Sequence, residues 1–216
     1  GTLAIDEGSI ALEGEDITHA TPARMRALRG NRMAMVFQEP MTALNPLMTV
    51  GNQIAEAIRV HRGDMSAAEI RARVQVLMTD VRLPDPERMI GAYPHQMSGG
   101  MRQRVMIAMA LANTPKLLLA DEPGTALDVS VQAQTLTLIR DLVEQNGTSV
   151  LFISHNLGLV LDTCDRLCVM YSGEAVETGS IEDVFDKMRH PYTQALFRSI
   201  PLPGADKNAR PLVAIP

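Results

Sequence analysis

Four short runs of apolar residues recur along the chain, and stretches with helical periodicity separate them. They are rich in β-branched or large aliphatic side chains and end at Phe37, Ala120, Ser154 and Tyr171. Short apolar runs of this kind predict buried strands, and strands that alternate with helices favour a parallel sheet with crossover helices. The predicted fold class is therefore α/β.

The first two runs are separated by about 80 residues, far more than a simple crossover needs. Ser66 and Glu69 have the spacing of a capping box, which marks the start of a helix. The apolar residues that follow share one helical face: Ile70, Val74, Leu77, Met78 and Val81. This pattern predicts a helical subdomain inserted into the sheet. Near the N-terminus a strand, a turn at Glu13-Gly14 and a second segment are predicted, and a hairpin is predicted about Ser172-Gly173.

Charge and composition exclude some partners. The formal net charge is −5 and the pI is about 5.5, whereas binding to a nucleic-acid backbone normally needs clustered Lys and Arg. We therefore expect no nucleic-acid partner. The longest uninterrupted apolar run, 105–112, is too short to span a bilayer. Cys164 and Cys168 are expected to be free thiols that serve as packing residues.

Polar residues follow the first three apolar runs: Gln38, the pair Asp121 and Glu122, and His155. Because ligands bind at the carboxyl ends of the strands in an open parallel sheet, we expect these four side chains to meet in one crevice. Their chemistry suits phosphoryl transfer, where catalysis is mostly positioning and charge stabilisation.

Each of these four residues has a predicted role. Asp121 holds Mg²⁺ directly or through water. Glu122 accepts a proton from the attacking water. Gln38 offers its amide oxygen to the metal or to the water, and His155 donates a ring N–H to a terminal phosphate oxygen.

A Ser-Gly-Gly sequence, Ser98 to Gly100, stands directly before a run of buried helical character. A helix N-terminus has unpaired N–H groups and a partial positive charge, and glycines let the backbone approach an anion closely. The predicted function of this turn is to bind phosphate. The simpler alternative is a capping turn alone.

These residues lie in motifs that resemble the ATPase subunits of ABC transporters, and the motifs occur in that family's order. They are a Q-loop, "FQEPMTALNP"; a signature, "MSGGMRQR"; Walker B with the D-loop, "LLLADEPGTALD"; and a switch histidine in "ISHNLGLV". The segment "HPYTQAL", 190–196, is similar to the subgroup that imports dipeptides, oligopeptides or nickel.

The resemblance implies a P-loop NTPase core with an inserted helical subdomain. The expected parts are 1–38, the N-terminal part of the core up to the Q-loop, and 39–112, the helical subdomain with the signature. Residues 113–189 would carry Walker B, the D-loop and the switch histidine, and 190–216 would be a C-terminal extension.

The resemblance also implies ATP and Mg²⁺ as cofactors and a sandwich of two such subunits, identical or different. In that sandwich Ser98, Gly99, Gly100 and Met101 of one subunit cover the ATP bound by the other, and Asp128 couples the two sites.

Membrane permease subunits are implied as further partners, with a solute-binding protein acting indirectly. The chain would then lie at the cytoplasmic face of the membrane, as a peripheral subunit. Glu39, Met41 and Asn45 would face a coupling helix of the permease.

The sequence also departs from the family pattern. The P-loop, G-x-x-x-x-G-K-[ST], is absent, because none of the three lysines follows a glycine. Either the chain is a fragment of a complete ATPase that lacks the N-terminal part, or it is a shortened protein that lost its own nucleotide site. We expect very weak ATP binding and no hydrolysis from these 216 residues alone. Smaller departures are Met97, Gly124 and Asn156.

Two other functions are weighed against an importer ATPase. One is a non-catalytic partner that lends only its signature to the ATP of a complete subunit. The other is an ABC-type ATPase of DNA repair or chromosome structure, which the acidic charge balance and the "HPYTQAL" segment disfavour.

Overall fold

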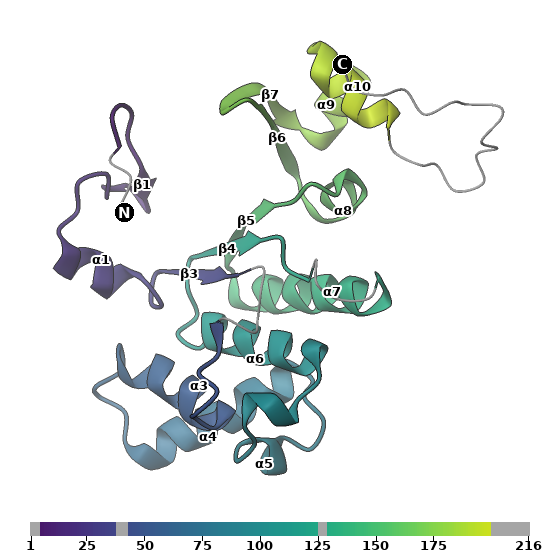
Figure 1. Ribbon diagram of the computed structural model, residues 1–216. Coiled ribbons are helices and arrows are strands. Elements are labelled where there is room, and N and C mark those ends of the chain that lie inside the picture. The colour runs from purple at the N-terminus through teal and green to yellow at the C-terminus, as the bar shows by residue number, and fades with distance from the viewer. Residues whose placement is uncertain (1–4, 38–42, 125–128, 200–216) are drawn as a thin grey trace. The chain divides into compact units, whose positions relative to one another are not determined.

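Three of the four apolar runs form one sheet in the computed structural model, which describes residues 5–37, 43–124 and 129–199. β3 (Met33–Val36) pairs in parallel with β4 (Leu117–Asp121), and Val36 lies opposite Ala120. β5 (Ser149–Ile153) joins the other side of β4, so the strand order is β3-β4-β5 (Figure 1). The predicted parallel pairing is confirmed for β3 and β4.

β5 differs from the buried strand that its sequence predicts. Val150, Leu151 and Ile153 are 37%, 54% and 48% exposed, whereas β4 buries Leu118 and Ala120 completely. The reason is what packs on the sheet. Ala34 and Val36 of β3 and Leu118 of β4 belong to the hydrophobic core of the first part of the chain, whereas no described side chain of β5 belongs to that core.

The fourth apolar run forms a hairpin instead of joining this sheet. β6 (Arg166–Tyr171) pairs antiparallel with β7 (Glu174–Ser180) in a separate two-stranded sheet. Ser172 and Gly173 have φ values of 51° and 87°, as the tight turn of a hairpin requires. The predicted hairpin is confirmed. The expectation of a fully buried strand is wrong, because β6 alternates and buries only Leu167 and Val169.

The predicted N-terminal turn also forms. β1 (Ala11–Leu12) and β2 (Glu15–Asp16) pair antiparallel around Glu13 and Gly14, which both have positive φ. A short helix follows, α1 (Pro22–Leu28), and the Thr21 side chain caps its first turn.

Between β3 and β4 the chain forms a group of helices, as predicted (Figure 1). They are α3 (Val50–Arg59), α4 (Ala67–Asp80), α5 (Pro86–Met89), the 3-10 turn η1 (Pro94–Gln96) and α6 (Gly99–Leu111). The capping box of α4 is confirmed: Ser66 Oγ accepts from the Glu69 backbone, and the Glu69 carboxylate accepts from the Ser66 backbone. The predicted apolar face of α4 is buried.

α7 (Val129–Asn146) packs against α6, and both helices run in the same direction (Figure 1). Gly100 near the start of α6 meets Val131 near the start of α7. Further along, Leu111 of α6 and Leu142 of α7 line one hollow. The hydrophobic core of this part of the chain lies between these helices, α3, α4 and the inner strands.

The chain divides into two compact units, Gly1–Leu151 and Phe152–Pro216. The second unit contains the β6–β7 hairpin with α8 (Leu157–Thr163), α9 (Ile181–Asp186) and α10 (Pro191–Arg198). Its core consists of Leu157, Val160, Leu167, Val169, Val184 and Phe197. No helix within the described residues is long and apolar enough to cross a membrane.

The two cysteines of this unit differ in environment. Cys164 packs against the core, and burial raises the pKa of its thiol. Cys168 is exposed, and its Sγ accepts a hydrogen bond from Thr178 Oγ1. Both thiols are free, as predicted, but only Cys164 is a packing residue.

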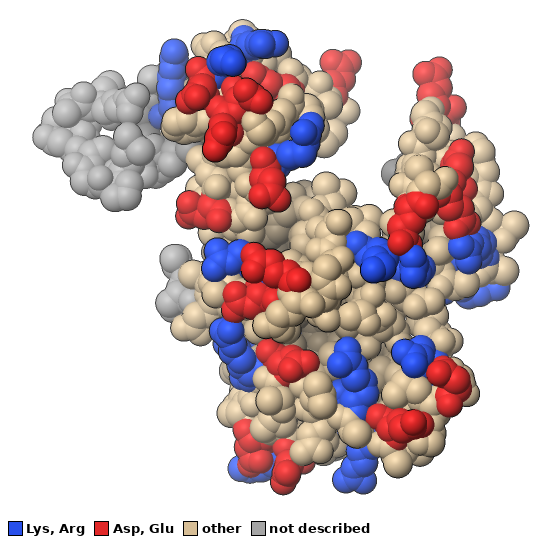
Figure 2. All heavy atoms as spheres, turned by 180° about the vertical axis from the view of Figure 1, so that it is seen from behind, with Lys and Arg blue, Asp and Glu red and all other residues tan. Residues whose placement is uncertain are grey.

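On the face seen in Figure 2, basic and acidic side chains are interspersed instead of forming a field of one sign. Ion pairs among the described residues include Arg82 with Asp141 and Arg62 with Asp64. This face therefore lacks the continuous basic surface that binding to a nucleic-acid backbone needs.

Candidate functional site

The carboxyl end of β4 carries the predicted magnesium ligand and the predicted general base. Asp121 is the last residue of the strand and is half-buried, while Leu118 and Ala120 anchor the strand in the core. Since β3 and β4 are parallel and in register, β3 ends at the same edge of the sheet. A carboxylate held there by a buried strand has the hard oxygen donors that Mg²⁺ prefers.

Glu122 has an unusual backbone. Its φ is 44°, in the left-handed region that non-glycine residues rarely adopt. The next two residues, Pro123 and Gly124, are buried, and Gly124 has a φ of 100°. The chain thus turns sharply where β4 ends. Strained backbone of this kind concentrates at functional sites, which supports a functional role for Glu122.

The Ser-Gly-Gly turn begins α6. Ser98 is exposed, and its Oγ accepts a hydrogen bond of 3.2 Å from the Met101 backbone N–H. The hydroxyl proton of Ser98 is not used in that bond, so it can still be donated to an anion. The first turn of α6 has no acidic residue. This helix end is therefore capped and carries the partial positive charge that suits a phosphate group.

The packing of α6 against α7 also requires a glycine at position 100. A Cβ atom at this position would lie 3.0 Å from Val131 Cγ1, closer than such contacts normally are. The absence of a side chain therefore lets α6 approach α7 closely, in addition to any approach of an anion. Met101 is half-buried and packs against the core.

Of the remaining predicted site residues, one lies in the second unit and two lie outside the described residues. His155 follows β5, is exposed, and belongs to the second unit, whereas Asp121 and Glu122 belong to the first. Gln38 and Asp128 lie outside the described residues, as do Glu39 and Met41. The convergence of the four strand-end side chains stays a prediction.

Asn156, which departs from the family pattern after the switch histidine, has a local structural role. It is the N-cap of α8, and its Oδ1 accepts from the Leu159 backbone N–H. Asp and Asn are comparable N-caps, so this departure leaves the start of the helix intact.

Sequence reasoning missed two residues that hold the helical group together. Gln53, which is 4% exposed, fixes the loop before α3: its Oε1 accepts from Asn45 N at 2.9 Å, and its Nε2 donates to Asn45 O and Met48 O. Arg104 on α6 donates to the carbonyls of Val81 and Arg82 at the end of α4. Burial lowers the pKa of the Arg104 guanidinium. The only indication in the sequence that Gln53 would be buried is that apolar residues on the same face of α3 flank it.

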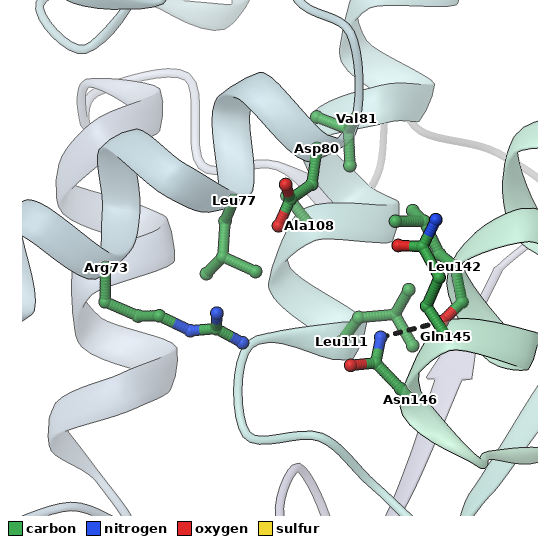
Figure 3. A pocket seen from close by; sticks show the side chains of 9 residues that line it. All are labelled: Arg73, Leu77, Asp80, Val81, Ala108, Leu111, Leu142, Gln145 and Asn146. Carbon is green, nitrogen blue, oxygen red and sulfur yellow. Dashed lines mark hydrogen bonds between the residues drawn. The ribbon is translucent and has the colours of Figure 1, made fainter.

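A hollow of about 340 Å³, including its open mouth, lies where α4, α6 and α7 meet (Figure 3). Leu77, Leu111 and Leu142 line its floor, and the polar side chains of Arg73 and Asp80 lie at its rim. None of the predicted site residues lines it. A triphosphate needs several converging donors, and this hollow offers one cation beside one carboxylate, so we do not assign it to nucleotide.

The described residues contain no group of three or more His, Cys, Asp or Glu side chains that could hold a metal ion. The residues present nevertheless fit a magnesium nucleotide. Asp121 supplies a carboxylate at a strand end, and Mg²⁺ is usually held by one or two carboxylates together with phosphate oxygens and water.

The "HPYTQAL" segment builds the start of α10. His190 caps this helix, with its Nδ1 accepting from Tyr192 N at 3.1 Å. The Tyr192 ring packs on Tyr171 of β6, with ring centroids 4.5 Å apart. The Glu177 carboxylate accepts from the backbone N–H groups of Arg189 and His190. Glu177 was also missed, and no local sequence signal indicates its role.

Replacing Glu177 by Gln is expected to lower the melting temperature of the full-length subunit at pH 7 by about 2–4 °C. The backbone hydrogen bond from Arg189 holds the pKa of Glu177 below its usual range. A carboxylate with a lowered pKa stabilises the folded state above its ordinary pKa of 4.5, and this stabilisation is lost as pH falls through the folded-state value.

The difference in melting temperature between Glu177→Gln and the unmodified protein should therefore narrow as the pH falls below 4.5, the ordinary pKa of the carboxyl group. Thermal unfolding at a series of pH values measures this difference in melting temperature. Glu174→Gln, at an exposed position on the same strand, is the matched control and should leave the melting temperature unchanged. A Glu177→Gln difference that is constant with pH would contradict the assigned role.

Comparison with known proteins identifies the family. The ABC transporter family matches residues 1–125, more than half of the chain, and the oligopeptide/dipeptide transporter C-terminal region matches residues 176–215. A protein of Sinorhizobium fredii named as a peptide ABC transporter ATP-binding protein is 53% identical over 90% of this chain and 58% of its own length.

Other relatives have similar names. A peptide import ATP-binding protein of Brucella abortus is 50% identical over 95% of this chain and 62% of its own length. The glutathione import ATP-binding protein GsiA of Salmonella typhimurium is 53% identical over 88% of this chain and 30% of its own length. The chain thus spans about 60% of the length of the peptide-import relatives.

Among solved structures, a dimeric ATP-binding cassette in a post-hydrolysis state bound to ADP and Pi matches with a TM-score of 0.71 and 29% sequence identity. The match covers 82% of this chain and 74% of that one. The predicted α/β fold and the predicted family are confirmed. The chain belongs to the ABC transporter ATP-binding family and carries the C-terminal region of its oligopeptide/dipeptide transporters.

Proposed function

We propose that this chain is the larger part of a subunit that binds and hydrolyses ATP and thereby energises an ABC importer of peptides. The observation that carries the proposal is the end of β4, where a half-buried Asp121 is followed by Glu122 in a left-handed backbone conformation. The names of the relatives, which are peptide or glutathione import ATP-binding proteins, support the peptide class of substrate. They do not favour a non-catalytic partner or a DNA-repair ATPase.

In this proposal the strand-end residues serve one hydrolytic site. Bound ATP would supply the phosphoryl group, and Mg²⁺ would neutralise the negative charge of its oxygens. Asp121 and Gln38 would hold the metal, the latter through its amide oxygen. Glu122 would accept the proton of the attacking water, and His155 would donate a ring N–H to a terminal phosphate oxygen.

The signature turn would serve a second subunit. Ser98 and the N–H groups of Gly99, Gly100 and Met101 would contact the nucleotide bound by that partner. The N-cap Ser98 is exposed, and the first turn of α6 has no acidic residue. Asp128 would couple the two sites. The dimeric state of the matching ATP-binding cassette supports this arrangement.

The P-loop is proposed to lie in a part of the complete protein outside these 216 residues. Three observations support this. The relatives are longer, and the sequence has no Gly-Lys pair. The exposed side chains of Val150, Leu151 and Ile153 on β5 also offer an apolar surface that such a part would cover.

The remaining partners follow from the importer assignment. Membrane permease subunits would contact the loop that contains Asn45, and a solute-binding protein would act through them. The subunit would then be peripheral, at the cytoplasmic face of the membrane.

The test is to purify the full-length subunit with its permease and to measure ATP turnover with and without a peptide-loaded binding protein. We expect magnesium-dependent turnover that the loaded binding protein stimulates, and a Gly-Lys-Ser/Thr loop in the full-length sequence. An assembled complex without ATP turnover would contradict the proposal, and turnover stimulated only by a non-peptide solute would contradict the substrate class.

A further inference from the structure

Gln103 is a polar side chain buried in the signature helix. It lies one turn beyond Gly99 and Gly100 on α6 and is 0% exposed. Within the part of the chain that the structure describes, neither its Nε2 nor its Oε1 has a hydrogen-bond partner. Buried amides are normally paired, because an unpaired one gives up its bonds to water without replacement. The position therefore requires an explanation.

Gln53 shows what a paired amide looks like in the same core. It is also on a helix and almost as deeply buried, at 4% exposed. Its amide makes three hydrogen bonds of 2.9–3.0 Å, to Asn45 N, Asn45 O and Met48 O. Gln103 differs from Gln53 in its pairing, not in burial or residue type.

The neighbouring helix offers a partner. Gly100 contacts Val131 of α7, and the two helices run in the same direction, so Gln103 and Thr135 each lie about one turn beyond this contact. Thr135 is 1% exposed, and its Oγ1 donates to Val131 O at 2.9 Å. A hydroxyl group that donates one hydrogen bond can also accept one. Thr135 Oγ1 could therefore accept a hydrogen bond from Gln103 Nε2 while it still donates to Val131 O.

The unpaired amide lies within a packed part of the α6–α7 contact. Further along the two helices, Leu111 and Leu142 are buried in the shared core and line the floor of the open surface hollow of Figure 3. The amide of Gln103 is therefore the feature of this contact that is not expected of the most stable arrangement of two helices.

We propose that Gln103 is a positioning residue for the signature turn. It disfavours the arrangement of α6 against α7 described above and favours a second one, in which Gln103 Nε2 donates to Thr135 Oγ1 and the signature turn binds the nucleotide of a second subunit. This inference rests on the proposed function. The cost of one unpaired buried amide changes the equilibrium between the two arrangements of α6 and α7 by roughly ten- to a hundredfold.

The first measurement is thermal unfolding of the full-length subunit without nucleotide. Gln103→Met removes the amide at similar volume and is expected to raise the melting temperature by about 2–4 °C. Gln53→Met is the matched control and should lower it, because it breaks three hydrogen bonds. A fall with Gln103→Met would show that the amide is already paired and would overturn the inference.

The second measurement is the ATP dependence of turnover in the complete transporter. Gln103→Met should raise the ATP concentration for half-maximal turnover about tenfold with little change in kcat, since the reacting groups are untouched. Thr135→Val should have the same effect, and the double variant should be no worse than either single one.

Additive effects would exclude Thr135 as the partner, and an unchanged ATP dependence would overturn the positioning role. If the unmodified transporter has no turnover, the proposed function fails. The melting comparison still decides whether the amide is unpaired, so the two failures are distinguishable.

Discussion

Replacing Glu122 by Gln in the full-length subunit is expected to lower ATP turnover by about 10²–10⁴-fold. The amide has the same shape as the carboxylate but cannot accept the proton of the attacking water. ATP binding and ATP-driven association of two subunits should remain, because Asp121 and the signature turn are unchanged. Steady-state turnover and size-exclusion chromatography with ATP measure the two effects.

Glu144→Gln is the matched control for this experiment. Glu144 is an exposed carboxylate on α7, away from the end of β4, and its replacement should leave turnover intact. A Glu122→Gln subunit with normal turnover would refute Glu122 as the base, whereas loss of ATP binding would show that Glu122 is needed for the nucleotide itself.

Replacing Ser98 by Asp is expected to weaken ATP-driven association by about 10²–10³-fold without destabilising the subunit. Asp is as good an N-cap as Ser, and a negative charge near a helix N-terminus is stabilising, so α6 should still begin at Gly99. A carboxylate about 4 Å from a phosphate oxygen repels it by about 4 kcal/mol near a protein surface, before screening by salt.

The Ser98→Asn variant distinguishes the effect of the added negative charge from the effect of losing the helix cap. Asn keeps the cap without adding charge, so its effect on association should be much smaller than that of Asp. ATP-driven association is expected to be strongest with Ser at position 98, weaker with Asn and weakest with Asp. The melting temperatures of all three proteins should be similar. Equal association of the Asp and Asn variants would contradict phosphate binding at this turn and would leave Ser98 as a helix cap alone.

Some elements could be predicted from the sequence because short-range patterns specify them. The capping box of Ser66 and Glu69 and the apolar face of α4 predict a helix whose start and burial are confirmed. The hairpin at Ser172-Gly173 is confirmed for the same reason, because its turn requires positive φ. The family motifs are likewise local, and the comparisons confirm the family.

The candidate site was predictable only in part. The sequence places Asp121 and Glu122 at the end of a strand and Ser98 before a helix, and the structure agrees. It gives no sign of the left-handed backbone at Glu122, of the contact between Gly100 and Val131, or of the carboxylate of Glu177 at the start of α10. Each of these depends on neighbours that a local pattern does not specify.

By itself, the sequence determined the strand-forming runs, the inserted helical group, the capping box at Ser66, the two turns and the family, because these follow from periodicity and from residues close together in the chain. Only the tertiary structure decided which apolar strand remains exposed and which buried amide is paired. Val150 and Leu118 both look like core residues, and Gln53 and Gln103 are the same residue on similar helices. Burial and hydrogen bonding are set by contacts between residues far apart in the chain, and these form only when the helices and strands pack together.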